Sequence, residues 1–289
     1  MDSRSRTSAL AALFLGAIAL GFTPIFVRLT ETGPAAAGFW RLALALPMLA
    51  PFAFRGEGAK GPDRLILLAG VFFALDLAFW HYGIAYTSVV NATVLANLTP
   101  IVVTVVGWWL FRERPARAFL IGLALGIAGA VIVALARHSG PQVGTKPQLG
   151  DLLAALTTLW YSGYFLCVRV ARGSRNTGAI MFWSSLVGVV ALAGVMFTLH
   201  EQVIPTGLSG WGACLGLAFV HVCGQGAIAW ALGRLPAATA AVVVLIQPVV
   251  AAFLGWLLFG EAVVAMQAAG AVLALAGVAI AQWSAARQA

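Results

Sequence analysis

The sequence predicts an all-α polytopic membrane protein with ten transmembrane helices arranged as two repeats. Apolar residues make up 62% of the 289-residue chain and charged residues only 9%, with a mean hydropathy of +0.97. A chain of this length with so few polar residues cannot cover the surface of a soluble globule. In addition, the chain contains ten apolar stretches long enough to cross a bilayer, and its second half repeats its first.

Each predicted span contains roughly 18 to 24 residues, which is the length a helix needs to cross the hydrocarbon core. The apolar runs are too long for strands and lack the period-two alternation of a membrane barrel. In chain order the spans are 9–29, 35–54, 65–85, 88–111, 117–136, 151–171, 177–199, 210–231, 237–259 and 265–284.

The duplication is clearest around two prolines that lie 148 residues apart. The segment from Pro100 reads PIVVTVVGWWLFRE and the segment from Pro248 reads PVVAAFLGWLLFGE, with seven of fourteen positions identical. Such internal symmetry is typical of transporters built from two related bundles. We therefore expect a first five-helix repeat at 1–137, a connecting loop at 138–150 and a second five-helix repeat at 151–289.

The distribution of Lys and Arg predicts that both termini are cytoplasmic. With the N-terminus inside, three basic residues fall outside (Arg28, Arg137 and Lys146), Arg41 lies within a span, and thirteen fall inside. Five spans per repeat then place the two repeats in opposite orientations, with a substrate site between them. The thirteen are Arg4, Arg6, Arg55, Lys60, Arg64, Arg112, Arg114, Arg117, Arg169, Arg172, Arg175, Arg234 and Arg287.

Several other classes of function are disfavoured by the same pattern. The basic residues lie between apolar spans and form neither a stripe nor a tail, so we expect no nucleic-acid partner despite a pI near 10.3. Cys167, Cys214 and Cys223 lie inside spans without a C-x-x-C pair, which indicates neither a disulfide framework nor a metal site. We expect no cofactor and no metal.

Prolines mark the predicted hinges. Pro100 and Pro248 lie near the middle of spans 88–111 and 237–259, and a proline leaves the carbonyl four residues earlier without its amide donor. Asn97 and Gln247 lie beside these breaks, as the lining of a substrate pathway requires. The alternative is a kink that only improves packing. Pro24 has no counterpart in the second repeat and is predicted to be a further hinge.

Four acidic or basic residues lie well away from the ends of the predicted spans. Asp76 is either a proton carrier or partner for a ligand ammonium group, or else a hydrogen-bonded residue that holds its helix to its neighbours. His81 and His221 are candidates for a role in transport, since each can titrate near neutral pH, and His81 is also predicted to contact substrate; a buried neutral histidine is the commoner case. Arg41 either attracts a carboxylate or extends along the helix to the outer interface, and we favour the second interpretation.

Aromatic side chains deep in the spans are candidates for substrate contact because the polar atoms of Trp and Tyr need partners there. Plain core packing is the alternative for these residues. Rings attract aromatic ligands and cations by similar amounts, so the pattern does not separate the two substrate types. The candidates are Trp80, Tyr82, Trp160, Tyr164 and Trp183.

The chain resembles the ten-span, EamA-type members of the drug/metabolite transporter superfamily. The resemblance rests on YGIAYTSVVNATVLANLTP…LFRE in the first repeat and WALGRLPAATAAVVVLIQP…LFGE in the second. The aromatic spans and the segment FWR at 39–41 are most similar to YddG-type exporters of aromatic amino acids. That resemblance implies a multi-pass protein of the bacterial inner membrane that exports amino acids by alternating access through a central cavity.

The predicted function is therefore transport of a small molecule, not catalysis, by a monomer in the lipid bilayer. One alternative is a proton-coupled exporter of drugs or quaternary ammonium compounds. The four-span members of the superfamily use a glutamate in their first helix for proton exchange, whereas the span 9–29 has no carboxylate. A non-transporting scaffold and an intramembrane enzyme are alternatives of another class, but no extramembrane domain or nucleophile with a base supports them.

Overall fold

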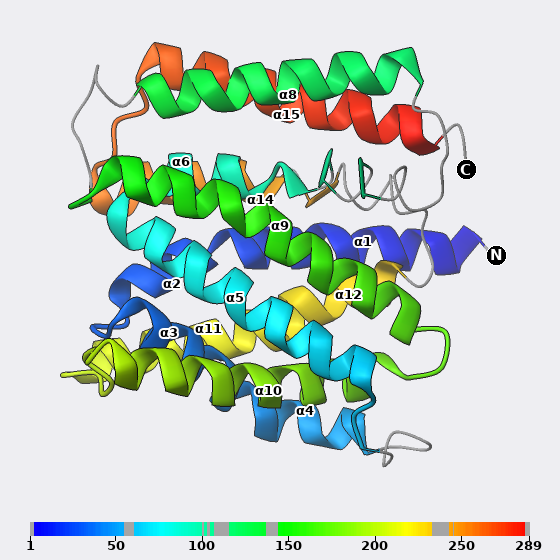
Figure 1. Cartoon of the computed structure of the whole chain (residues 1–289), viewed down its shortest axis with the longest axis vertical. Helices are drawn as coiled ribbons and strands as arrows, with labels where there is room; N and C mark the ends of the chain where they lie inside the picture. The colour runs from blue at the N-terminus through cyan, green and yellow to red at the C-terminus, as the bar shows by residue number, and fades with distance from the viewer. Residues whose placement is uncertain are drawn as a thin grey trace.

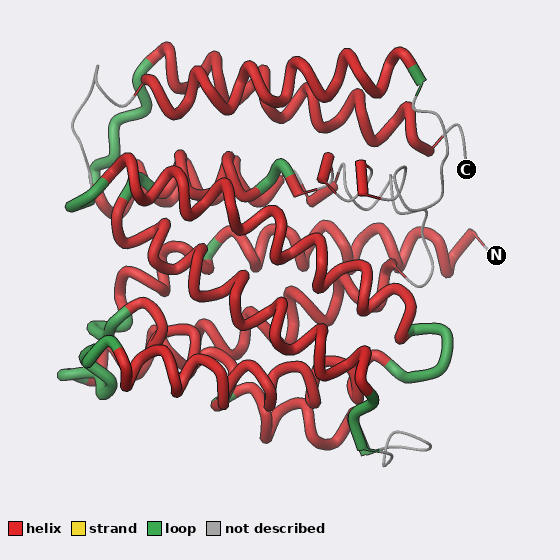
Figure 2. Tube along the Cα trace, viewed as in Figure 1, coloured by secondary structure: helices red, strands yellow, loops and turns green. Residues whose placement is uncertain are grey.

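A computed structural model describes residues 3–54, 61–99, 101–102, 105–106, 116–136, 144–232, 243–244 and 246–286. Throughout these residues the regular structure is helical, and short turns join the helices at the two ends of a bundle (Figure 2). Pro100, Glu113 and part of the 138–150 loop lie outside the described residues. The helices run side by side, and both termini lie at one end of the bundle (Figure 1).

The helices coincide with the predicted spans. Several spans consist of two or three consecutive helices. In order they are α1 (Ser3–Gly21), α2 (Thr23–Leu29), α3 (Pro34–Ala43), α4 (Ala45–Ala53), α5 (Arg64–Tyr86), α6 (Val89–Ala96), α8 (Arg117–Ala136), α9 (Pro147–Ala171), α10 (Thr177–Thr198), α11 (Leu208–Val220), the π-helical turn η3 (His221–Gln225), α12 (Gly226–Leu232), α14 (Ile246–Phe259) and α15 (Ala265–Ala286).

Six helical segments of the described chain are long and apolar enough to cross a membrane, and three shorter apolar helices accompany them. Large apolar side chains such as Val190 and Val272 are more than two-thirds exposed, at 68% and 69%. Contiguous apolar surface of this kind is unfavourable in water and is expected where helices contact lipid.

Proline accounts for the interruption between α1 and α2. Pro24 has no amide hydrogen to continue the ladder of α1, and α2 restarts with Pro24 in its first turn, where amide groups are unpaired in any helix. Pro248 lies within α14, and the described residues on both sides of it are helical. The hinge roles of Pro24, Pro100 and Pro248 remain predictions.

The pairing of helices connects the two halves of the chain. α5 packs along α9, while α1 packs against η3 and α12, so the third span of each half lies against the first span of the other. In the same way α6 contacts α9, and α14 contacts α1. α8 and α15 pair with each other and lie along one edge of the bundle (Figure 1).

Glycines allow α8 and α15 to approach closely. A Cβ atom added to Gly129 would lie 2.3 Å from the amide nitrogen of Ala274, and one added to Gly277 would lie 2.3 Å from that of Gly126. Both distances are shorter than van der Waals contact, so no larger residue fits without separating the backbones. Small residues at helix contacts are the usual device for close packing in membranes.

Candidate functional site

A group of polar side chains from α3, α5, α9 and η3 meets in the interior of the bundle. We call it the central polar cluster. Its depth follows from Asp76, which lies ten residues before the end of α5 at Tyr86. This separation is about 15 Å along a helix, or half the thickness of a hydrocarbon core. The members are Arg41, Asp76, Tyr161, Tyr164, His221 and Gln225.

Arg41 is at the centre of the cluster's electrostatics. It interacts with Asp76, Tyr161 and Tyr164, and its charge also acts on His221. The side chain is only 3% exposed, and its Nε and Nη1 atoms have no hydrogen-bond partner among the described residues. The sequence-based preference for an arginine that reaches the outer interface is therefore wrong. The buried position on α3 keeps the guanidinium inside the bundle.

Asp76 is 6% exposed and does not contact Arg41 directly, although the two charges interact. Direct ion pairs in the described part of the chain include Arg28 with Glu261 and Arg175 with Asp63, whereas Arg41 and Asp76 form none with each other. Arg41 and Asp76 therefore place a guanidinium and a separate carboxyl group inside the membrane-spanning region.

Aromatic rings pack against this cluster. Phe73 of α5 stacks on Tyr164 of α9 at 4.5 Å between ring centroids, and on His221 of η3 at 5.5 Å. Tyr161 lies beside Tyr164 at 5.9 Å. Because Phe73 and Asp76 are three residues apart, they share one face of α5, which places the rings next to the carboxylate.

The π-helical turn η3 orients two members of the cluster. Gln225 donates a hydrogen bond from Nε2 to the Tyr161 hydroxyl at 3.0 Å, and His221 Nε2 lies 3.1 Å from the Ser185 hydroxyl of α10. His221 Nδ1 has no partner among the described residues. Single π-turns within α-helices occur frequently at functional sites. Sequence reasoning singled out neither Gln225 nor Ser185.

Trp80 and His81 lie next to the cluster on α5. Trp80 is 8% exposed and packs with Val27 and Leu217, while its indole nitrogen has no partner in the described structure. His81 is fully buried, and its Nδ1 lies 3.1 Å from the carbonyl oxygen of Pro34. Its Nε2 has no hydrogen-bond partner among the described residues.

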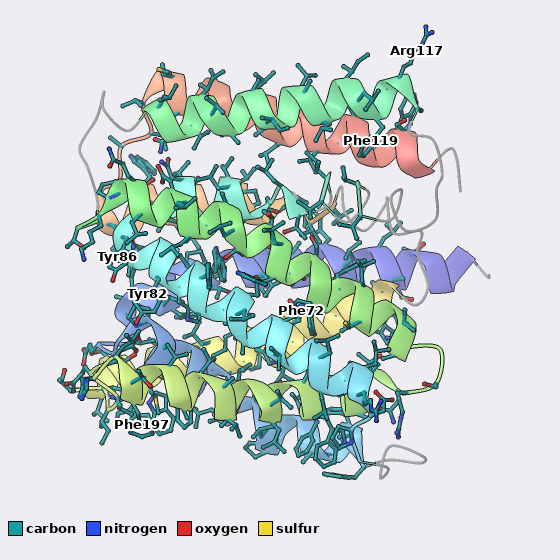
Figure 3. All side chains as sticks on the ribbon, in the orientation of Figure 1. Phe72, Tyr82, Tyr86, Arg117, Phe119 and Phe197 are labelled. Atoms are coloured by element: carbon teal, nitrogen blue, oxygen red, sulfur yellow. The ribbon has the colours of Figure 1, made fainter. Side chains whose placement is uncertain are left out.

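The remaining aromatic candidates are distributed along the bundle. Trp160 packs on Phe72 at 6.5 Å and on Phe79 at 5.6 Å, at the contact of α9 with α5. Trp183 lies 6.4 Å from Phe54 and packs near the start of α10. Tyr82 lies near the end of the bundle that is opposite the termini (Figure 3).

The residues beside the predicted breaks have local partners. Asn97 caps α6 and donates from Nδ2 to the Thr93 carbonyl at 2.8 Å. The Ala96 carbonyl, for which Pro100 has no donor, accepts a hydrogen bond from the Thr99 hydroxyl at 2.8 Å. Gln247 lies in the first turn of α14, where its carbonyl faces Gly21 of α1.

The end of the bundle opposite the termini carries carboxylates that cap helices of other spans. We call it the capped end. Glu201 accepts hydrogen bonds from Ala35 N (3.2 Å) and Ala36 N (2.8 Å) at the start of α3, and from the Tyr82 hydroxyl. Glu261 accepts from Val89 N at 3.0 Å, at the start of α6, and pairs with Arg28.

Glu31, in the first half of the chain, caps a helix of the second half. It lies between α2 and α3 and accepts hydrogen bonds at the start of α11 from Thr206 Oγ1 (2.6 Å), Ser209 Oγ (2.6 Å) and Gly207 N (2.8 Å). Negative groups at helix N-termini satisfy free amides and interact well with the helix dipole. Hydrogen bonds from Ser209 and Thr206 lower the pKa of Glu31 below its ordinary value of 4.5. These caps had no local sequence signal.

No group of three or more His, Cys, Asp or Glu side chains within the described ranges has the arrangement of a metal site. The cluster combines unpartnered hydrogen-bond donors, one carboxyl group and stacked rings. It is composed of side chains from both halves of the chain.

Comparison with known proteins decides the family. The model of the EamA-like transporter family matches residues 7–135 and again residues 148–282. The chain belongs to the EamA-like transporter family. It is accordingly a ten-helix, multi-pass membrane protein of a transporter family, and both matched segments carry residues of the central polar cluster.

Among the relatives, an uncharacterized transporter of Archaeoglobus fulgidus is 27% identical over 94% of this chain and 95% of its own length. A probable amino-acid metabolite efflux pump of Salmonella typhimurium is 26% identical over 93% of this chain and 92% of its own length. The pseudopaline exporter of Pseudomonas aeruginosa is 26% identical over 72% of this chain and 71% of its own. A solved structure with 21% identity superposes with a TM-score of 0.67, covering 95% of this chain and 98% of that one, which supports the fold.

Proposed function

We propose that this transporter exports amino acids, foremost aromatic ones, and related small metabolites across the bacterial inner membrane. The central polar cluster carries this proposal. A buried arginine, a separate carboxylate and stacked rings at mid-depth match the charged groups and the ring of an aromatic amino acid. A relative named as an amino-acid metabolite efflux pump, similar over nearly the whole chain, supports the same substrate class.

In the proposed mechanism the two halves, 1–137 and 151–289, are inverted repeats that alternate between two states around the cluster. The reciprocal helix pairings of the two halves support this relation. The capped end would be the outer face and both termini cytoplasmic, as the distribution of Lys and Arg indicates. Opening of this end requires that Glu31, Glu201 and Glu261 release the helix starts that they cap. The hinge roles of Pro24, Pro100 and Pro248 are part of the proposal, as is a monomeric state.

A second candidate, proton-coupled export of cationic compounds, is favoured by one observation, the mid-depth carboxylate of Asp76. The two functions are separated by uptake of labelled tryptophan into proteoliposomes, with and without an imposed pH gradient. Phenylalanine, alanine and a quaternary ammonium dye serve as competitors. We expect saturable tryptophan uptake without a gradient, inhibited by phenylalanine more than by alanine. Dye flux that follows the pH gradient, without tryptophan flux, would establish the second candidate instead.

A further inference from the structure

The guanidinium of Arg41 is a buried charge with unpartnered hydrogen-bond donors in the described part of the bundle. It is 3% exposed, and both Nε and Nη1 lack a hydrogen-bond partner there. Arginine does not lose its proton in proteins, so neutralisation is not an alternative. A buried charge without a counter-group is very costly. The unpartnered donors therefore indicate that an anionic group binds at this position.

Asp76 does not fill that role, because its carboxylate interacts with Arg41 without contacting it. A direct ion pair would have used the donors of Arg41 and left an overall neutral interior with no free group. Instead, the guanidinium and the carboxyl group are separated, with the stacked rings of Tyr164 and Phe73 beside them. A ligand that carries both charges and a ring would satisfy all three features.

We propose that Arg41 binds the carboxylate of the transported molecule and that Asp76 receives its ammonium group. The inference rests on the proposed amino acid transport and adds the chemical class, an α-amino acid zwitterion. Charge-assisted hydrogen bonds to an arginine provide both affinity and orientation. The same cation repels amines that lack a carboxylate, so the site discriminates against quaternary ammonium compounds.

The test compares three indole compounds as inhibitors of labelled tryptophan uptake into proteoliposomes. These are tryptophan itself, tryptamine, which lacks the carboxylate, and indole-3-propionate, which lacks the amine. In the wild type, both analogues should inhibit at least about tenfold more weakly, because each loses one charge-assisted contact. A wild-type carrier that accepts tryptamine as well as tryptophan would overturn the inference.

Variants then assign each contact. Arg41→Met should raise the KM for tryptophan at least about tenfold and remove the preference for tryptophan over tryptamine. Arg41→Lys should retain part of that preference. Asp76→Asn should remove the preference for tryptophan over indole-3-propionate. The matched control is Arg64→Met, which removes an exposed arginine at the start of α5 and should leave uptake unchanged.

The outcomes also separate this inference from the function on which it rests. If the wild type carries none of tryptophan, phenylalanine or alanine, amino acid transport itself is refuted. If it carries tryptophan while Arg41→Met keeps both the KM and the preference over tryptamine, only the role of Arg41 is refuted. Size-exclusion chromatography and helical circular dichroism verify that each variant is folded. If Arg41→Met is unfolded, Arg41→Lys and the analogue series in the wild type decide the question.

Discussion

Thr99 performs a backbone function in the fourth span. Its hydroxyl donates to the Ala96 carbonyl, and Thr99 itself is 6% exposed. Without that donor the half-buried carbonyl would have no partner, because position 100 is a proline. Thr99→Val keeps the volume and removes the donor, so we expect a loss of about 1 to 3 kcal/mol in unfolding free energy.

The measurement is the thermal unfolding midpoint in detergent for wild type, Thr99→Val and Thr99→Ser. Serine retains the hydroxyl and should unfold near the wild-type temperature. Equal midpoints for wild type and Thr99→Val would show that the Ala96 carbonyl does not depend on Thr99.

Glu31 predicts a pH-dependent contribution to stability. Since its pKa is lowered in the folded protein from 4.5, the unfolded chain takes up the proton first as the pH falls. The stabilisation is therefore fully present above 4.5 and is lost as the pH falls through the lower folded pKa. We expect the difference in unfolding midpoint between wild type and Glu31→Gln to be constant well above pH 4.5 and to shrink as the pH falls below 4.5.

Ser209→Ala provides the matched control, because it removes one of the donors that lower the pKa. In this background the folded pKa lies closer to 4.5, so the contribution should be smaller and its loss should be complete at a higher pH. A difference between wild type and Glu31→Gln that stays unchanged down to about pH 3 would contradict this interpretation, since an ordinary carboxylate is protonated there.

At the scale of elements, the contact of α8 with α15 predicts a sharp difference between neighbouring glycines. A Cβ atom at Gly129 meets the backbone nitrogen of Ala274 at 2.3 Å, whereas one at Gly126 meets the flexible end of Ile101 at 2.7 Å and a backbone atom only at 4.0 Å. Gly129→Ala should therefore separate the helices and cost about 1 to 3 kcal/mol. Gly126→Ala should be tolerated, because alanine favours the helix.

Thermal unfolding in detergent compares the two alanine variants with the wild type. The contact between α8 and α15 would have to be looser than the structure shows if Gly129→Ala and Gly126→Ala unfolded at the same temperature.

The capped end predicts energetic coupling between Tyr82 and Glu201. The Tyr82 hydroxyl donates to the carboxylate that also caps α3. Tyr82→Phe and Glu201→Gln should each lower the unfolding midpoint, and the double variant should lose less than the sum, because the two residues share one interaction. A double-mutant cycle with additive effects would mean that the two side chains act independently.

For the whole molecule, the all-helical fold and the positions of the spans were predictable because length and hydropathy depend on local sequence. The break before α2 was also predictable, since Pro24 acts on its own helix. Family membership, indicated by the sequence motifs, is confirmed by a match to both halves of the chain.

The contacts of the candidate site were less accessible from sequence. The rule that arginine reaches toward an interface ignores its neighbours, and here Arg41 remains buried between helices. Sequence also gives no signal for the π-helical turn that orients His221 and Gln225. The caps made by Glu31 and Glu201 join residues more than 160 positions apart, beyond the reach of local capping patterns.

The central claim is that substrate passes through the bundle while the capped end opens and closes. Glu31→Cys with Ser209→Cys, in a background without Cys167, Cys214 and Cys223, places two thiols across that end, where the native side chains are 2.6 Å apart. Tryptophan counterflow in proteoliposomes is measured before and after treatment with a short thiol cross-linker. We predict counterflow in the untreated protein and background rates after cross-linking, with no effect on the cysteine-free parent. Undiminished counterflow after complete cross-linking would contradict the account.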